Sequence, residues 1–440
     1  MQPTLSFEQA PPISVPYRFF LTAPLFGVVA GLLLAWYGPE AMASRWSSGA
    51  LAMTHLIVVD VMLQVMCGAL LQFVAVAAGA NIWRPLLVAA IVHPMITAGA
   101  VLLASAFVLE LPVLFLMAAL VFALALGFFL TVMMIALWRT PARGMTIVVL
   151  RLAVFGLGVT LALGVTLACT LGLQAGPPLT LINVHVAWGL GGWALMLVIG
   201  VSYLVVPMFQ LTPAYPLWLT RVLPFALLLV LSLWSLQIFA SGGEAQDWQV
   251  QVAQAGMLLA GFYAVATLVL QWRRRRRQTD VTFLFWRVAM LSLLAYAASW
   301  LLLDAIPELG RHPRAPLWLG VLVLPGVFLS VIIGMLYKIM PFLNWLHLQR
   351  ISDPGMPPPN MKQMIPEGAM RGQMRLHFLA FGLLLMAVVW PPLALPAGLA
   401  FTASCLWLEW NLLGALWKYE YFRDLALTDQ TRAAGAAHGP

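Results

Sequence analysis

Charged residues are scarce in this chain of 440 residues: they make up 9% of it, whereas hydrophobic residues make up 62%. A soluble domain contains about 25% charged and about 45–50% apolar residues. The scarcity of charge therefore excludes a soluble globular protein and a disordered one. It indicates an integral membrane protein, and its partner is then the lipid bilayer in which it is embedded.

Cysteine is also rare. Cys67, Cys169 and Cys405 each stand alone within an apolar run, and no CxxC pair occurs. This pattern excludes a disulfide framework and a zinc site built from thiolates. The sequence also lacks a Walker motif, a GxGxxG motif, an HExxH motif and a nucleophile elbow. It therefore does not support the catalytic chemistry that these motifs perform in soluble enzymes.

Long apolar runs are abundant. A membrane-spanning helix needs about 20 apolar residues, whereas a strand of a membrane β-barrel needs about 10, and the runs here have helical length. We therefore predict an all-α integral membrane protein that forms a single polytopic transmembrane domain over residues 1–440. The expected spans cover residues 17–37, 50–79, 84–107, 112–138, 145–173, 179–211, 217–240, 250–272, 282–303, 317–345, 375–394 and 396–420.

Basic residues lie mostly in one set of loops. With twelve spans, the loops on the side of both termini hold most lysines and arginines, including a basic run at residues 273–277. The opposite loops hold only Arg45, Arg311 and Arg314. The positive-inside rule then predicts a multi-pass protein of the bacterial cytoplasmic (inner) membrane with cytoplasmic N- and C-termini. Because topology accounts for the net charge of +8, that charge does not indicate a nucleic-acid partner.

A short pattern recurs along the chain. The second span contains CGALLQFVAVAAG with Gly68, the sixth ends in IGVSYLVVPMF with Gly200, and the tenth contains IGMLYKIMPFL with Gly334. These glycines are 132 and 134 residues apart, which is four spans each time. The spacing predicts three pseudo-repeats of four helices, roughly residues 17–140, 145–272 and 282–420. The second, sixth and tenth spans would be equivalent.

Three of the seven histidines lie within spans, where an ionisable side chain is costly and needs a reason. At a rise of about 1.5 Å per residue, His55, His93 and His185 lie at compatible depths in the middle or outer part of the membrane. We expect the others in an external loop, in the tail, or at cytoplasmic helix ends: His312, His438, His347 and His377.

The three buried histidines are candidate ligands, because neutral imidazole commonly binds haem iron, copper and zinc. Gly189 and Gly192 follow His185 on the same helix face, where small residues leave room for a flat macrocycle. We predict that His55, His185 and His93 bind haem b or copper. The competing interpretation is that these imidazoles and glycines only pack helices together.

Other polar residues within spans suggest a path for protons. Asp60 lies on the second span, and Gln72, Tyr203 and Lys338 lie toward the cytoplasmic ends of their spans. The four form a candidate polar or proton path. Hydrogen bonding between helices, with snorkelling of the lysine to the interface, is the alternative.

Together these features resemble subunit I of the haem–copper oxidase superfamily and, more closely, the NnrS-type haem- and copper-containing membrane proteins. The likeness is carried by THLIVVDVMLQVMCGALLQ around His55, by the third span around His93, by NVHVAWGLGGW around His185, and by IGVSYLVVPMF. The resemblance implies twelve helices in three four-helix units around a haem or copper centre. It also implies a role in respiratory or nitric-oxide-related redox metabolism.

The chain departs from the oxidase pattern at the ligands. Its seventh span has no histidine, and its tenth has none before His347 at the cytoplasmic end. Four residues after His185 stands Gly189 instead of a tyrosine, and Asn183 stands where related sequences have a second histidine. A complete oxygen-reducing centre is therefore not supported, and enzymatic activity stays open. We expect electron transfer or gas-ligand handling, with a cytochrome or a respiratory-complex subunit as partner.

Two other functions are compatible with the sequence. Twelve spans also suit a transporter, here one of copper or haem, and Pro207 and Pro341 interrupt two of them. A non-catalytic subunit or assembly factor of a respiratory complex would explain the missing ligands.

Overall fold

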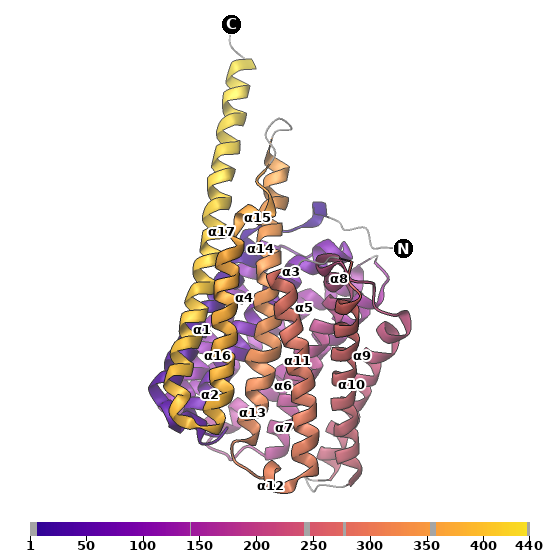
Figure 1. Ribbon diagram of the computed structural model, residues 1–440, viewed down its shortest axis with the longest axis vertical. Helices are drawn as coiled ribbons and strands as arrows, with labels where there is room; N and C mark the ends of the chain where they lie inside the picture. The colour runs from indigo at the N-terminus through magenta and orange to yellow at the C-terminus, as the bar shows by residue number, and fades with distance from the viewer. Residues whose placement is uncertain (1–6, 141, 242–246, 276–278, 353–357, 438–440) are drawn as a thin grey trace.

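The computed structural model describes residues 7–140, 142–241, 247–275, 279–352 and 358–437, and these residues are almost entirely helical (Figure 1). Twelve of the helical segments are long and apolar enough to cross a membrane, which confirms the predicted number of spans. The protein is thus a multi-pass membrane protein. Part of the basic run, Arg276 and Arg277, lies outside the described residues.

Nine spans are single helices. Their bounds are α1 Ser14–Tyr37, α4 Pro85–Leu109, α5 Pro112–Arg139, α6 Met145–Gly172, α9 Leu217–Ala240, α10 Asp247–Trp272, α11 Val281–Ala305, α16 Glu367–Val389 and α17 Ala394–Ala437. Short helices lie in the connections: η1 Phe7–Gln9, η2 Gly38–Met42, α12 Pro307–Gly310, α15 Met361–Met364 and η6 Pro391–Leu393.

The second, sixth and tenth spans differ from the others, because each contains an eight-residue π-helical segment between two α-helices. They run α2 Ser48–His55, η3 Leu56–Leu63, α3 Gln64–Ala78; α7 Leu179–Ala187, η4 Trp188–Leu195, α8 Met196–Gln210; and α13 Ala315–Val321, η5 Leu322–Leu329, α14 Ser330–Ile351. The π segments begin 132 and 134 residues apart, the same spacing as the recurring glycines. Segments of this kind often occur at functional sites.

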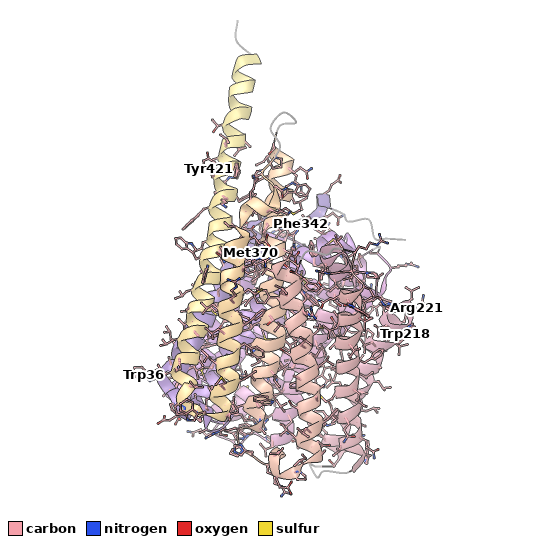
Figure 2. The ribbon with its side chains drawn as sticks, in the orientation of Figure 1. Trp36, Trp218, Arg221, Phe342, Met370 and Tyr421 are labelled. Carbon is pink, nitrogen blue, oxygen red and sulfur yellow. The ribbon has the colours of Figure 1, made fainter. Side chains whose placement is uncertain are left out.

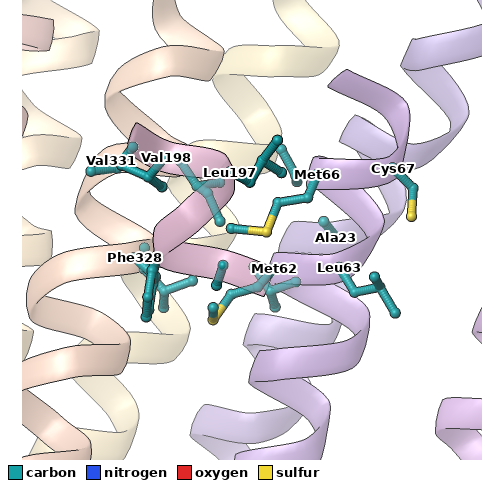
Figure 3. Close-up of a cluster of buried hydrophobic side chains, with 14 of the residues drawn as sticks. Ala23, Met62, Leu63, Met66, Cys67, Leu197, Val198, Phe328 and Val331 are labelled. Carbon is teal, nitrogen blue, oxygen red and sulfur yellow. The ribbon is translucent and has the colours of Figure 1, made fainter. Parts of the chain in front are cut away.

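The same three spans form the interior of the bundle. In their most apolar 18-residue stretches, 78, 67 and 72% of the residues are buried, against 44% or less in the other nine. Figure 3 shows where they meet: Met62 and Met66 of the second span point toward Leu197 and Val198 of the sixth. Phe328, from the tenth span, is buried in the same core cluster.

The outer spans enclose this centre and expose apolar side chains. The first and last spans, α1 and α17, pack closely along each other. Trp36, near the C-terminal end of α1, and Trp218, near the start of α9, project from opposite flanks of the bundle (Figure 2), with 85 and 58% of their surfaces exposed. Exposed tryptophans near helix ends are typical of the two membrane interfaces.

Both ends of the described chain lie at one end of the bundle, which we call the terminal side (Figure 1). The predicted bounds of the last two spans are too narrow there, because α16 begins at Glu367 and α17 continues to Ala437. Hydropathy marks only the apolar part of a helix. The first turn of α16 is instead held by an ion pair of 2.7 Å between Glu367 and Arg371, one turn apart.

Candidate functional site

A cavity of about 590 Å³ lies among the second, sixth and tenth spans, toward the side opposite the termini. Helices α1, η2, α4, α5, α6, α16 and α17 contribute the other helical residues of its walls. Volumes of about 300–1,000 Å³ are typical of sites for small molecules and cofactors. Almost all described lining residues are apolar. Apart from tryptophan, the polar exceptions are Arg45, Thr54, His55, Thr160 and His185.

His55 lies at the C-terminal end of α2, immediately before the π segment η3. Its Nδ1 lies 2.8 Å from the carbonyl oxygen of Leu51, and its ring stacks on Phe107 at 4.9 Å between centroids. A carbonyl oxygen only accepts hydrogen bonds, so Nδ1 carries the proton, and the lone pair of the neutral ring resides on Nε2. Among the described residues, the hydrogen bond of this ring is the one at Nδ1.

His185 occupies the equivalent place at the end of α7, just before η4. Its Nδ1 lies 3.2 Å from the carbonyl oxygen of Thr160 on α6, so the same reasoning leaves the lone pair on Nε2. Gly164 gives the ring room, because a Cβ atom there would lie 2.9 Å from the Cε1 atom of His185. Helix α6 therefore both orients this imidazole and makes space for it.

The two imidazoles share one compartment. Both side chains line the same cavity, and each lies at the end of the α-helix that precedes a π segment. Metal-bound histidines almost always donate their second ring N–H to a carbonyl, a carboxylate or water, which sets the tautomer and the orientation of the ring. In both His55 and His185, Nδ1 donates to a backbone carbonyl oxygen in this way.

His93 is not part of this group. It does not line the cavity, and its Nε2 lies 2.8 Å from Oγ1 of Thr22 on α1. Because the Thr22 hydroxyl donates to the carbonyl oxygen of Arg18, it accepts from His93, whose Nε2 therefore carries the proton. The expected trio is thus reduced to a pair by the direction in which α4 presents His93. Within the described ranges, no three His, Cys, Asp or Glu side chains lie close enough to hold a metal ion.

Of the two glycines expected beside a cofactor, only Gly189 lines the cavity. A Cβ atom there would meet only the Thr160 methyl group at 3.4 Å. Gly192 lies outside the cavity lining and packs against Gly156 of α6, where a Cβ atom on residue 156 would lie 2.0 Å from the Gly192 carbonyl oxygen. One glycine leaves room in the cavity, and the other lets two helices touch.

The four residues of the expected polar path belong to separate surroundings. Asp60 and Gln72 are buried with unpartnered side-chain oxygens. Tyr203 packs against Tyr215, with ring centroids 5.3 Å apart. Lys338 forms an ion pair of 2.9 Å with Asp280. No hydrogen bond between described residues connects the four into one path, so the path stays a prediction.

Arg45 is a site residue that sequence reasoning treated only as a loop residue. It lines the cavity, lies over the ring of Trp46 at 4.2 Å, and donates to the Oδ1 of Asn183 at 3.4 Å. Half-burial lowers the pKa of its guanidinium from the ordinary value. Nothing in the local sequence indicates this contact, because residues 45 and 183 meet only through the packing of α7.

His377 is a second residue that the sequence placed differently. The sequence predicts it at a helix end, but α16 begins ten residues earlier, and His377 is 1% exposed. Its Nε2 lies 3.3 Å from the hydroxyl of Ser330. His377 therefore lies within α16, beside the tenth span, and it does not line the cavity.

Comparison with known proteins does not identify the chain: no protein family matches it, and no curated protein matches it either. The functional interpretation therefore rests on the cavity and its side chains. What that arrangement offers chemically is two nitrogen lone pairs in an apolar space with one cationic side chain at its edge.

Proposed function

We propose that the protein binds a b-type haem in the cavity through His55 and His185. The observation that carries this proposal is a pair of imidazoles that line one apolar compartment, each with Nδ1 bound to a carbonyl oxygen so that the lone pair is on Nε2. A haem iron needs only one or two axial ligands from the protein, because the macrocycle supplies the others. A zinc site takes three or four protein ligands, and within the described residues no three His, Cys, Asp or Glu side chains lie close enough to supply them.

The surrounding residues fit a flat, mostly apolar group. A Cβ atom on Gly320 would meet nothing within 4 Å, and Gly320 and Gly189 both line the cavity, so glycines of the tenth and sixth spans leave space in it. The guanidinium of Arg45 is suited to pairing with the carboxylates at the edge of a haem. The aliphatic and aromatic walls exclude water and thereby strengthen these polar contacts.

A bound haem supplies one-electron transfer and, where an axial position is free, binding of a diatomic gas. The chain's contribution is to hold the iron with imidazole nitrogens, to keep the site dry and to fix the orientation of the ring. We infer a role in electron transfer or gas-ligand handling within respiratory or nitric-oxide-related metabolism. The tenth span offers only apolar residues and glycine to the cavity, such as Gly320, Val321 and Leu324, which argues against a complete oxygen-reducing centre.

The resemblance to the haem–copper oxidase and NnrS group remains part of this proposal, with three four-helix units around the second, sixth and tenth spans. The three equivalent π segments support it. So does the packing of Gly68, Gly200 and Gly334, where an added Cβ atom would lie 2.7–3.0 Å from a side chain of the preceding span in each case. The proposed setting is the bacterial cytoplasmic membrane with cytoplasmic termini.

An optical spectrum of protein purified in mild detergent from haem- and copper-replete cells tests the proposal, together with a pyridine haemochrome assay and metal analysis. We expect stoichiometric haem b. His55→Ala and His185→Ala should each lose haem or change its axial ligation, because each removes one nitrogen donor. His93→Ala, which alters a histidine outside the cavity, should leave the spectrum unchanged.

The outcomes are distinct. Full haem with an unchanged spectrum in both cavity variants would contradict the assignment of ligands. Stoichiometric copper without haem would replace haem by a metal site. Absence of both would favour a transporter or a non-catalytic subunit of a respiratory complex.

A further inference from the structure

A buried carboxyl group lies outside the cavity lining, in the π segment of the second span. Asp60, in the π segment η3, is 0% exposed, and neither of its carboxyl oxygens has a hydrogen-bond partner among the described residues. Gln64, four residues further along the same span, is also 0% exposed. No described cation forms an ion pair with this carboxyl.

An ionised carboxylate in this position would be expensive. Burying a charge without a partner costs several kcal/mol or more, and the group instead takes up a proton and becomes neutral. Asp and Glu side chains within membrane spans are accordingly characteristic of proton relays and ion pathways. Among the helices packed against η3, the residues that carry titratable side chains are Tyr17, Arg18 and Tyr37 on α1, His55 on α2, Cys67 on α3 and His93 on α4; η5 has none.

A series of polar side chains leads from Asp60 toward the terminal side. The amide of Gln64 donates to Oγ1 of Thr97 on α4 at 2.8 Å. The Thr97 hydroxyl donates to the backbone carbonyl oxygen of His93, one turn earlier, at 3.0 Å. The ring of His93 donates to Thr22 on α1 at 2.8 Å. The Thr22 hydroxyl in turn donates to the carbonyl oxygen of Arg18, also at 2.8 Å.

The far end of this series reaches the membrane surface. At about 1.5 Å per residue, Thr22 lies about 12 Å and Arg18 about 6 Å from the first residue of α1. His93 and Thr97 are partly exposed, whereas Gln64 and Asp60 are fully buried. The series thus runs from the fully buried Asp60 to the part of α1 near the terminal side, through side chains of three helices.

We propose that Asp60 is a reversible proton-binding site that exchanges its proton with the terminal side of the membrane through Gln64, Thr97, His93 and Thr22. The ligand is the proton itself. It binds to the Asp60 carboxylate from solvent on the terminal side and returns to that solvent past the same residues. The site does not depend on the presence of a haem in the cavity.

Infrared spectroscopy of the full-length protein in lipid nanodiscs tests the proposal. The wild-type protein should show the carbonyl-stretch band of a protonated carboxylic acid, and D60N should lose it. E409Q serves as the matched control, because Glu409 on α17 is likewise buried, with an unpartnered carboxyl oxygen, but lies outside the series. Persistence of the same bands in D60N as in the wild type would overturn the proposal.

Exchange from H₂O into D₂O tests the route. The shift of the Asp60 band should be slowed several-fold by T97V and by Q64L, since each removes one polar step. T131V is the control: the hydroxyl of Thr131 also donates to a carbonyl oxygen one turn earlier, but on the exposed face of α5. Because T97V and Q64L retain Asp60, they test the exchange of its proton even if D60N does not fold. Exchange at the wild-type rate in both T97V and Q64L would refute the route.

Discussion

Gly164 of α6 lies directly against the imidazole of His185 on α7: a Cβ atom on residue 164 would lie 2.9 Å from the Cε1 atom of the ring. Thr160, whose carbonyl oxygen binds Nδ1 of the same ring, precedes it by one helical turn. One face of α6 therefore both positions His185 and leaves room for it. A substitution that fills the space at Gly164 but keeps His185 separates the effect of this space from the effect of the hydrogen bond to Thr160.

Gly164→Ala should displace the His185 ring while leaving the fold intact, because an imidazole at the end of a side chain moves more easily than a backbone. We expect reduced haem content and a changed spectrum, with little change in the unfolding temperature. The measurement pairs optical spectra with thermal unfolding in detergent. Gly127→Ala, at a position with nothing within 4 Å, is the control. A wild-type spectrum for Gly164→Ala would contradict the role given to this contact.

Filling the cavity should abolish binding without touching either histidine. Gly320→Phe adds a ring at a cavity-lining position where a Cβ atom meets nothing within 4 Å, so the side chain occupies the space proposed for the cofactor. Gly191→Phe is the matched control, since its position is equally open but is not part of the lining. Haem content per protein should fall for the first variant and stay unchanged for the second. Equal haem content in the two would place the cofactor elsewhere.

Arg45→Gln should weaken haem binding by about tenfold, because a hydrogen bond to a charged group contributes about 1.5 kcal/mol. The physical basis is the half-buried guanidinium at the cavity, held by Trp46 and Asn183. Titration of apoprotein with haem gives the dissociation constants. Arg311→Gln removes an exposed arginine on the same side of the membrane and should have no effect. Equal losses in both variants would indicate a general charge effect instead.

Gly156→Ala should destabilise the protein by about 3 kcal/mol, at the upper end of the usual effect of overpacking. Its Cβ atom would lie 2.0 Å from the carbonyl oxygen of Gly192, and a backbone atom has no rotamer by which to move away. Gly158→Ala, two residues along, would make only an ordinary contact of 3.9 Å with Leu130. Thermal unfolding should therefore show a large decrease for the first and none for the second. Similar stabilities would mean that α6 and η4 separate readily.

The sequence predicts some parts of the candidate site better than others. His55 and His185 do share a compartment, because depth in the membrane follows from counting residues along a helix of fixed rise. His93 has a compatible depth but points toward Thr22 on α1. Depth is a property of one helix, whereas direction depends on how that helix is rotated against its neighbours. The contact between Arg45 and Asn183 also depends on how the helices pack against each other, and no sequence pattern predicts it.

The number of spans and the spacing of the recurring glycines were determined by the sequence alone, because hydrophobicity and length decide which segments cross a bilayer. Tertiary structure decided what those spans do together: three of them acquire π segments and become the interior. It also decided that Gly189 lines the cavity while Gly192 packs against Gly156. Side chains on one apolar helix look alike in sequence, and only contact with neighbouring helices distinguishes the face that binds from the face that packs.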